Sequence, residues 1–260
     1  MIRADDEVGG AGPGGSAAPV IAFFDVDNTL MRGASIYHLG GGAYRRGYVG
    51  LRDLARFAWQ QARFIRVGEN LRHLEILRER ALGLAAGVRV SEVCDLAEEI
   101  FDRQIAPRLW PESVGLAREH LAKGHQVWLV TATPSIVAEV IARRLGLTGA
   151  LGTRLEEHDG CFTGRVLGSF LHGDHKASAA RELAARAGSP LTDCWAYSDS
   201  RNDIPLLELA GNRVVVNPDL ELARHAVKHG WSVMRLNKSS IRAARRRVRR
   251  EAKRATPPVE

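Results

Sequence analysis

The chain has 260 residues, of which 45% are hydrophobic and 26% charged, and no apolar run approaches the ~20 residues of a membrane-spanning helix. The net charge of +7 lies in residues 241–254, which hold seven Arg and one Lys against one Glu, so the rest of the chain is neutral. Cys94, Cys161 and Cys194 are scattered without a Cys-x-x-Cys pair, which argues against a disulfide framework or a zinc site. With no secretory signal pattern at the N-terminus, we expect a cytoplasmic protein.

The stretch from Val20 to Leu30 begins with five apolar residues and continues into two aspartates, Asp25 and Asp27. The apolar run predicts a strand buried on both faces, and the Gly- and Ala-rich residues 1–18 before it predict a disordered lead-in. Alternate side chains leave a strand on the same side, so the two carboxylates are expected to converge at its carboxyl end. A divalent cation such as Mg²⁺ would relieve their repulsion, whereas a pair of solvated turn residues is the simpler alternative.

Residues 33–110 show no pattern of a buried strand. Apolar spacings of three and four over 51–62 and 71–81, and the helical period that begins at Ser91, predict helices. We therefore expect residues 19–32 and 111–236 to form a core domain and residues 33–110 to form a helical cap domain. This Arg- and aromatic-rich insert is either a small subdomain with a solvated basic face or a lid that contacts substrate and excludes water.

From residue 111 onward, helices and strands alternate, which predicts an α/β, Rossmann-like fold with a mainly parallel sheet. Helices are expected over 112–123, 136–145, 174–187, 204–209 and 220–228, the second of them capped by Ser135. Strands are expected over 126–130, 150–155, 193–197, 213–216 and 231–236. A hairpin is expected to turn at Asp159-Gly160 and to return over 161–167.

Residues 237–260 are the basic C-terminal tail, in which Ile241, Ala244, Val248 and Ala252 form a thin apolar stripe. Such a helix can lie on an anionic membrane or bind nucleic acid. Because residues 241–254 have no aromatic side chain to stack on bases and only two β-branched side chains to insert into lipid, we favour a solvated terminus. Weak contact with an anionic membrane ranks next, and nucleic acid ranks last.

Polar side chains follow three of the predicted strands, and a lysine opens a helix between the last two. Because parallel strands end at the same edge of a sheet, we expect these groups to gather there: Asp25, Asp27, Thr131, Lys176, Asp199 and Asp203. Carboxylates alone would suit a bare cation. The added ammonium and hydroxyl groups indicate that the cation is shared with an anion, for which phosphate is the natural candidate.

Each of these groups has a role in phosphoryl transfer. Asp25 can attack phosphorus and form an aspartyl-phosphate, while Asp27 can protonate the leaving oxygen and then activate water. Mg²⁺ held by Asp25 and Asp199 would draw the nucleophile and the phosphate together.

Two groups remain for the oxygens of the phosphate. Lys176 and the Thr131 hydroxyl, with backbone N–H groups such as that of Ala132 after the strand, would bind them. Asp203 lies about one helical turn beyond Asp199, so it can reach the same ion or orient Lys176.

The segment Asp25-Val-Asp27-Asn-Thr29 resembles the Asp-x-Asp-x-Thr signature of the haloacid dehalogenase-like phosphatase superfamily. Thr131, Lys176 and residues 198–203 resemble its other three motifs in the family's order, and the insert resembles the cap of subfamily IB, the branch that includes phosphoserine phosphatase. The resemblance covers residues 20–236. It implies Mg²⁺, an aspartyl-phosphate intermediate, a metal ligand from the backbone carbonyl of Asp27, and supporting contacts from Asn202 and Asp203.

Three departures from the phosphoserine phosphatase pattern bear on the substrate. Ala34 stands nine residues after Asp25, where those enzymes usually carry a Glu that meets the serine ammonium. Ala132-Thr133-Pro134 replaces the two glycines that usually follow the hydroxyl of the second motif, and residues 198–201 read Ser-Asp-Ser-Arg in place of Gly-Asp-Gly-Ala. We therefore expect a small-molecule or lipid-headgroup phosphomonoester as substrate.

Other functions stay open at this point. The alternatives are a phosphoserine or histidinol-phosphate phosphatase, a phosphotransferase on the same scaffold, and a non-enzymatic protein that binds a polyanion through the basic tail. Intact Asp25, Asp27, Lys176 and Asp199 favour an enzyme, because binding alone would not need a nucleophile paired with an acid.

Overall fold

The computed structural model describes residues 18–50 and 85–244, together with residues 52, 55, 83 and 246. The helices expected over 51–62 and 71–81, nearly all of the expected lead-in, and most of the basic tail lie outside these residues, so those expectations stay predictions. Among the described residues, no helix is both long and apolar enough to cross a membrane. Cys94, Cys161 and Cys194 are free thiols.

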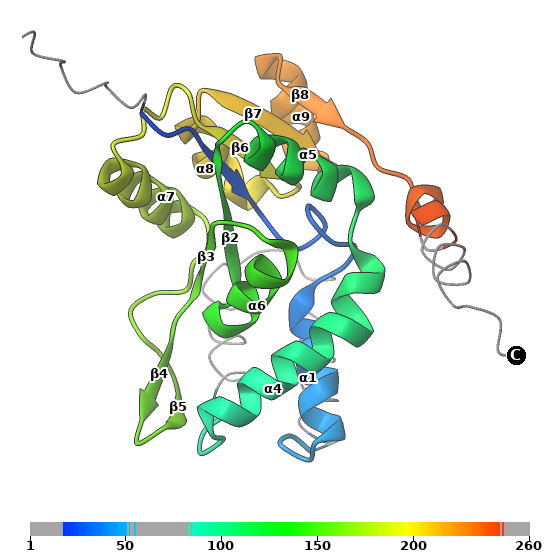
Figure 1. Cartoon of the computed structure of the whole chain (residues 1–260), viewed down its shortest axis with the longest axis vertical. Helices are drawn as coiled ribbons and strands as arrows, with labels where there is room; N and C mark the ends of the chain where they lie inside the picture. Colours follow the sequence, from blue (N-terminus) through cyan, green and yellow to red (C-terminus); the bar gives the residue numbers. More distant parts are fainter. Residues whose placement is uncertain are drawn as a thin grey trace, which may run out of the picture.

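Within the described residues, six parallel strands form one sheet in the order β3-β2-β1-β6-β7-β8 (Figure 1). Their bounds are β1 (Ile21–Phe24), β2 (Gln126–Pro134), β3 (Gly149–Thr153), β6 (Trp195–Ser198), β7 (Asn212–Val216) and β8 (Ser232–Met234). The predicted α/β fold with a mainly parallel sheet is confirmed. Because all six strands run in the same direction, their carboxyl ends lie at one edge of the sheet.

Helices cover both faces of the sheet. Ala22 and Phe24 of β1 pack in one core with α5 (Pro111–Ala122) and α6 (Ser135–Leu145). Ile21 and Phe23 pack in a second core with α7 (Asp174–Ala187), α8 (Ile204–Leu209) and α9 (Leu220–His229). All four strand residues are fully buried, as the unbroken apolar run predicts. Burial on both faces fixes β1 at the centre of the sheet and places Asp25 at its carboxyl end.

The described parts of the insert are helical. They comprise α1 (Ser35–Arg45), α4 (Val90–Ile100), a π-helical turn η1 (Phe101–Ile105) and a 3₁₀ turn η2 (Ala106–Arg108). Gly42 brings α1 close to α4, because a Cβ there would lie 2.8 Å from Leu96 Cδ1 and 3.0 Å from Ile100 Cδ1. The division into core and cap domains stays a prediction.

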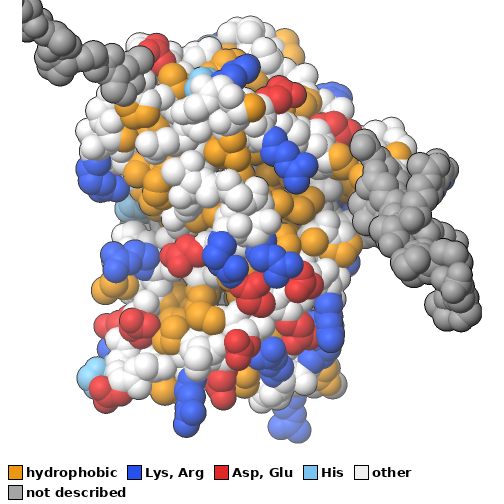
Figure 2. All heavy atoms as spheres, viewed as in Figure 1, with side chains coloured by type: hydrophobic (Ala, Val, Ile, Leu, Met, Phe, Trp, Pro, Cys, Tyr) orange, Lys and Arg blue, Asp and Glu red, His pale blue; other side chains and the backbone are white. Residues whose placement is uncertain are grey.

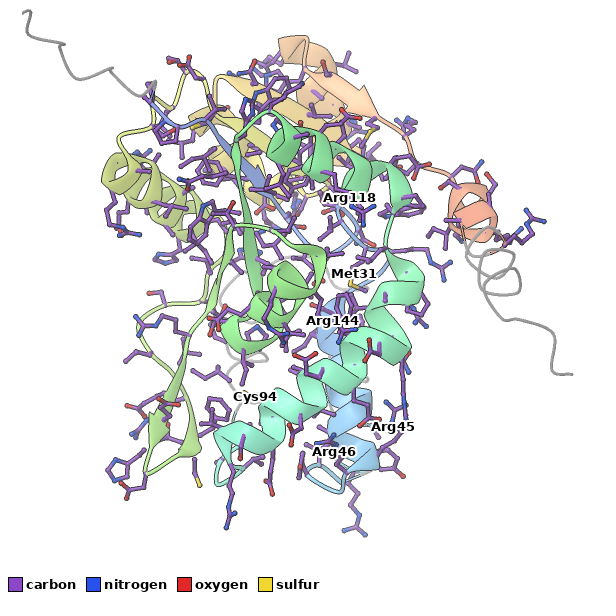
Figure 3. The ribbon with its side chains drawn as sticks, viewed as in Figure 1. Met31, Arg45, Arg46, Cys94, Arg118 and Arg144 are labelled. Carbon is purple, nitrogen blue, oxygen red and sulfur yellow. The ribbon has the colours of Figure 1, made fainter. Side chains whose placement is uncertain are left out.

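Polar contacts also connect the region of α4 to α6 and to a β-hairpin. Arg144 of α6, labelled in Figure 3, pairs with Glu98 of α4 and Asp102 of η1. Acidic and basic side chains are intermixed on this face of the molecule (Figure 2). The antiparallel hairpin of β4 (Leu155–His158) and β5 (Cys161–Val166), which turns at Asp159-Gly160 as expected, bonds to the backbone just before α4. There the N–H of Gly87 donates to the Phe162 carbonyl at 2.8 Å.

Some predicted boundaries are wrong, and β2 is the most consequential. The strand extends beyond residue 130 to Pro134, because β3 continues beside it after a shift in register between Val130 and Pro134. Thr131 therefore lies inside the strand instead of after it. At the other side of the site, the expected strand over 193–197 is found at 195–198, because residues 190–194 form turns closed by hydrogen bonds to Pro190 and Leu191.

The two predicted serine caps are also wrong. Helix α4 begins at Val90 with Arg89 as its N-cap, so Ser91 is already inside the helix. Helix α6 begins at Ser135 itself, after Pro134 with φ −51° and ψ 137°. Neither N-cap side chain bonds to the helix, because Arg89 and Pro134 have no short oxygen-bearing side chain for that purpose.

His120 of α5 is buried against the sheet. Its Nε2 lies 2.8 Å from the hydroxyl oxygen of Tyr197, and its Nδ1 lies 2.9 Å from Nδ1 of His125. Burial, with the neighbouring His125 and Lys123 next, lowers the pKa of His120 to about 4. The imidazole is therefore neutral in the folded protein at pH values where it would be charged in the unfolded chain.

This depressed pKa predicts a loss of stability in acid. The unfolded chain binds a proton on this imidazole near pH 6.5 and the folded protein near pH 4, so stability falls as the pH drops between these values. From about pH 7 to about pH 5, His120 should account for about 2 kcal/mol of the lost free energy of unfolding. Urea unfolding at both pH values should show a smaller loss for His120→Gln than for the wild type. An equal loss would contradict the prediction.

Candidate active site

A tight turn after β1 positions the two aspartates of the first motif. The backbone N–H of Asp25 donates to the Tyr197 carbonyl at 2.9 Å, which continues the ladder between β1 and β6. Asn28 adopts φ +59°, a left-handed conformation that asparagine tolerates, and its side chain accepts the Gly33 N–H at 2.9 Å. The turn therefore holds Asp25 at the end of the strand and Asp27 on the loop beside it.

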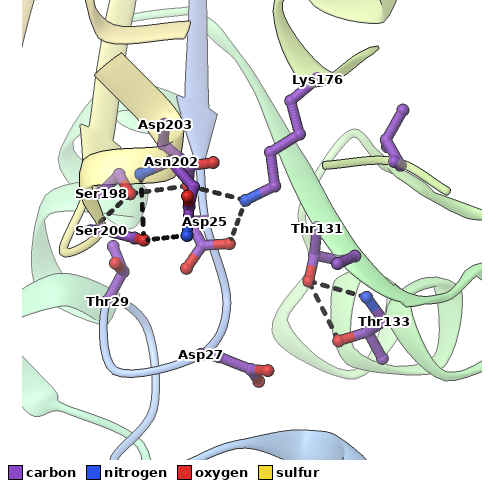
Figure 4. A network of polar contacts seen from close by, with 12 residues as sticks. Asp25, Asp27, Thr29, Thr131, Thr133, Lys176, Ser198, Ser200, Asn202 and Asp203 are labelled. Atoms are coloured by element: carbon purple, nitrogen blue, oxygen red, sulfur yellow. Dashed lines mark hydrogen bonds and ion pairs between the residues drawn. The ribbon is translucent and has the colours of Figure 1, made fainter. Parts of the chain in front are cut away.

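A buried ammonium group lies between two carboxylates (Figure 4). Lys176 Nζ donates to Asp25 Oδ1 at 2.6 Å and to Asp203 Oδ2 at 2.7 Å, and Ser198 Oγ donates to the same Asp203 oxygen at 2.7 Å. Asp25 is 5% exposed and Lys176 3% exposed. Gly173, at φ +55°, leads into α7 and delivers Lys176 in its first turn.

The electrostatics of the site favour a further cation. Burial raises the pKa of Asp25 to about 7, because the loss of solvation and the nearby Asp203 and Asp27 outweigh the opposite effect of Lys176. Burial, with the charge of Asp25 next, raises the pKa of Asp199 to about 8. For Lys176, burial would lower the pKa, but Asp203 and Asp25 raise it well above its usual value. The ammonium stays charged, and one lysine does not neutralise the surrounding carboxylates.

Asp199 follows β6 and is half-buried. Its Oδ1 accepts the Thr29 hydroxyl at 3.4 Å, and its carbonyl accepts the N–H of Asp219 at 2.9 Å. Ser200 caps the 3₁₀ turn η3 (Arg201–Asp203), where its Oγ accepts the backbone N–H of Asn202 at 3.3 Å and the side-chain amide at 3.2 Å. Asn202 thus holds the turn between Asp199 and Asp203.

A second group of contacts surrounds Thr131 and Asp27. Thr131 Oγ1 donates to Thr133 Oγ1 at 3.0 Å, and Thr133 Oγ1 lies 2.6 Å from Ser35 Oγ. The backbone N–H of Ser35 donates to Asp27 Oδ1 at 2.8 Å. The carbonyl of Ala132 accepts the Thr153 hydroxyl at 2.8 Å, which fixes the peptide between Ala132 and Thr133.

The structure thus places the predicted residues in two groups: Asp25, Lys176, Asp199 and Asp203 in one, and Asp27, Thr131 and Ala132 in the other. Sequence reasoning assigned no role to Thr29, Ser35, Thr133 or Ser198, although all four bond to these residues. Thr29 and Ser198 stand inside the recognised motifs and could have been found there. Ser35 begins a helix with no local pattern that distinguishes it.

The donor set fits a hard divalent cation, although it offers few side chains. Among the described residues, no group of three or more His, Cys, Asp or Glu side chains is arranged to hold a metal ion. Burial raises the pKa of both Asp25 and Asp199, and the charge of Asp25 further raises that of Asp199, so a cation beside them would be favoured. The carboxylates of Asp25 and Asp199 and the backbone carbonyl of Asp27 are oxygen donors of the kind that Mg²⁺ takes.

Comparison with known proteins shows the family to which the chain belongs. The model of the haloacid dehalogenase-like hydrolase family matches residues 22–208. Phosphoserine phosphatase SerB1 of Mycobacterium tuberculosis is 49% identical over 213 residues, which are 82% of this chain and 69% of that protein. Histidinol-phosphatase of Neisseria meningitidis is 29% identical over 219 residues, 82% of this chain and 97% of the other.

One solved structure is similar to this chain over most of its length. A protein of unknown function from Bordetella pertussis superposes with a TM-score of 0.75 at 33% identity, covering 84% of this chain and 99% of the other. The chain belongs to the haloacid dehalogenase-like hydrolase family. Within that family it is a phosphatase of the branch that includes the phosphoserine phosphatases, as the four motifs predict.

The buried charge cluster predicts a non-additive effect on stability. Lys176→Met should lower the free energy of unfolding by roughly 3–5 kcal/mol, because it leaves Asp25 and Asp203 buried without their cation. The double variant Lys176→Met/Asp203→Asn should recover part of that loss, since it also removes one of the two carboxylates. Urea unfolding measures both, with Lys228→Met on the exposed surface as the control. Losses that simply add would contradict the prediction.

Proposed function

We propose that this chain is a Mg²⁺-dependent phosphomonoester hydrolase that works through an aspartyl-phosphate on Asp25. The contact that carries this proposal is the 2.6 Å hydrogen bond from Lys176 Nζ to Asp25 Oδ1 at the end of the central strand. There a carboxylate and a permanent cation are held together where open parallel sheets bind ligands. Family members generally use Mg²⁺, and the paired Asp25 and Asp199 support the same ion here.

The residues divide the reaction into two steps. The Asp25 carboxylate attacks phosphorus, the bond to the ester oxygen breaks, and Asp27 gives that oxygen a proton. Water then attacks the phosphorus of the aspartyl-phosphate, Asp27 takes its proton, and inorganic phosphate leaves with Asp25 regenerated. Lys176, Thr131 and the backbone N–H of Ala132 bind the phosphate oxygens and stabilise the charge that develops on them.

The metal ion would be held by the carboxylates of Asp25 and Asp199 and by the backbone carbonyl of Asp27. When bound, it supplies positive charge that screens the nucleophile from the phosphate. Asp203 keeps Lys176 charged and oriented, because it accepts hydrogen bonds from Lys176 and Ser198 on one oxygen. Asn202 supports the turn on which Asp199 and Asp203 lie.

For the substrate we propose a small-molecule or lipid-headgroup phosphomonoester. Ala34, the residue before α1, has no group to meet an amino-acid ammonium, and the Thr133 side chain occupies a position where a glycine is usual. The name of the Mycobacterium tuberculosis relative supports phosphoserine as the alternative, and that of the Neisseria relative supports histidinol phosphate.

The remaining proposals concern the insert, the tail and the compartment. We propose that the insert is the cap over this site, since α1 begins directly beside Asp27. The basic residues 241–254 would make at most a weak contact with anionic membranes, and the free thiols support a reducing cytoplasm. Transfer of phosphate to an alcohol would use the same groups with an alcohol in place of water.

A turnover screen tests the activity and the substrate. With Mg²⁺ present, the wild type should release phosphate from p-nitrophenyl phosphate and from several small phosphomonoesters, with no marked preference for phosphoserine. Asp25→Asn should lose activity by at least about a thousandfold, because an amide does not replace the nucleophile. Strong selectivity for phosphoserine or histidinol phosphate would contradict the proposed substrate class and make that compound the substrate. An Asp25→Asn variant as active as the wild type would refute the mechanism.

Thermal unfolding tests the metal independently of turnover. Saturating Mg²⁺ should raise the Tm of the wild type by roughly 5 °C, because the ion binds only the folded site. Asp199→Asn should abolish that shift, while Asp193→Asn, an exposed carboxylate outside the site, should keep it. A Tm shift that survives in Asp199→Asn would mean that Asp199 does not hold the ion.

A further inference from the structure

Ser35 links three parts of the site that are distant in sequence. Its N–H donates to Asp27 Oδ1 at 2.8 Å, and its hydroxyl lies 2.6 Å from that of Thr133, which in turn accepts from Thr131 at 3.0 Å. Ser35 is 1% exposed and Thr133 5% exposed. A buried polar chain of this kind constrains every member, because a hydroxyl that loses its partner there cannot bond to water instead.

The position of Ser35 at the start of α1 leaves its backbone N–H without a partner inside the helix. Ser35 is the first residue of the helix, and the N–H groups of a first turn have no partner within the helix. Asp27 supplies an acceptor for one of them, and a carboxylate is favoured at that end of the helix. The start of α1 and the orientation of the Asp27 carboxylate therefore depend on each other.

We propose that Ser35 is a positioning residue for the acid step of the reaction. Its N–H fixes the Asp27 carboxylate beside the leaving oxygen, and its hydroxyl holds the start of α1 against the end of β2 through Thr133. Asp27 and the phosphate-binding Thr131 are thereby kept in register although they lie on different segments. This inference rests on the proposed hydrolysis, in which Asp27 protonates the leaving group.

Replacing Ser35 with proline tests how much the backbone N–H of this residue contributes to activity. The first position of a helix accepts proline, which lacks the donor, and Ala34 at φ −103° and ψ 129° has the extended conformation that precedes proline. Ser35→Ala is the matched control, because it removes the hydroxyl and keeps the N–H that bonds to Asp27. A difference between the two variants therefore reports on the N–H.

Two aryl esters of nearly the same shape distinguish positioning of the acid from general damage. The phenolate of phenyl phosphate is a more basic leaving group than p-nitrophenolate, so its departure depends more on a proton from Asp27. With Mg²⁺ present, Ser35→Pro should lower kcat/KM for phenyl phosphate at least about tenfold more than for p-nitrophenyl phosphate. Ser35→Ala should show a smaller bias in the same direction.

Equal losses on both esters would overturn the proposal, since a distorted fold lowers both alike. If Ser35→Pro does not fold, the proposal is tested with three other variants: Ser35→Ala, Thr133→Val and the double variant. Each single change should lower kcat/KM more for phenyl phosphate, and the double should be no worse than the more severe single variant, because both changes break one chain. Additive or unbiased losses would overturn the proposal. Wild-type protein that hydrolyses neither ester would instead refute the proposed function, and the role of Ser35 with it.

Discussion

The buried ammonium of Lys176 is the interaction on which the rest of the site depends. It joins Asp25 at the end of β1 to Asp203 in the turn after β6, and it comes from α7, so three separate segments meet at one charge. A buried ion pair contributes little net stability, because desolvation offsets much of the attraction. The cluster is better understood as the means by which the fold holds the proposed nucleophile, Asp25, in a buried place while keeping a cation beside it.

The topology of the sheet explains why this meeting point exists. From β1 the chain adds β2 and β3 on one side, and later β6, β7 and β8 on the other. The direction of winding reverses at β1, and open parallel sheets have a crevice at such a point. Asp25 stands at the end of the central strand, where Lys176 of α7 bonds both to it and to Asp203 in the turn after β6. The helical insert enters the chain at the same edge, which places the start of α1 beside the crevice.

Much of this arrangement follows from the sequence, for identifiable reasons. Phe23 and Phe24 in an unbroken apolar run predict a central strand, and the bounds of α7, from Asp174 to Ala187, are as expected, since Gly173 and Gly188 flank it. The gathering of Asp25, Lys176 and Asp203 follows from parallel strands that share an edge. These inferences succeed because the spacing of apolar residues and the glycines that end a helix act locally, within a few residues of the element that they define.

The parts that sequence reasoning missed depend on neighbours in space. The extension of β2 past Val130 requires β3 beside it, and the residue pattern of β2 alone cannot show that pairing. The preference of serine for N-caps predicted caps at Ser91 and Ser135, but packing placed both inside their helices. Ser35 joins Asp27 to Thr133 through contacts that span up to 98 positions in the sequence. No local signal distinguishes it from other helix starts.

Two of the three departures from the phosphoserine phosphatase pattern are linked through Ser35. Thr133 stands where a glycine is usual, and Ala34 precedes the serine whose hydroxyl lies 2.6 Å from that of Thr133. A glycine at 133 would offer Ser35 no side-chain partner, and the link between α1 and β2 would lose its hydroxyl pair. Of the two departures, Thr133 is the one that bonds to α1, through the hydroxyl of Ser35. The start of α1 is thus held by two contacts of one residue, its N–H to Asp27 and its hydroxyl to Thr133.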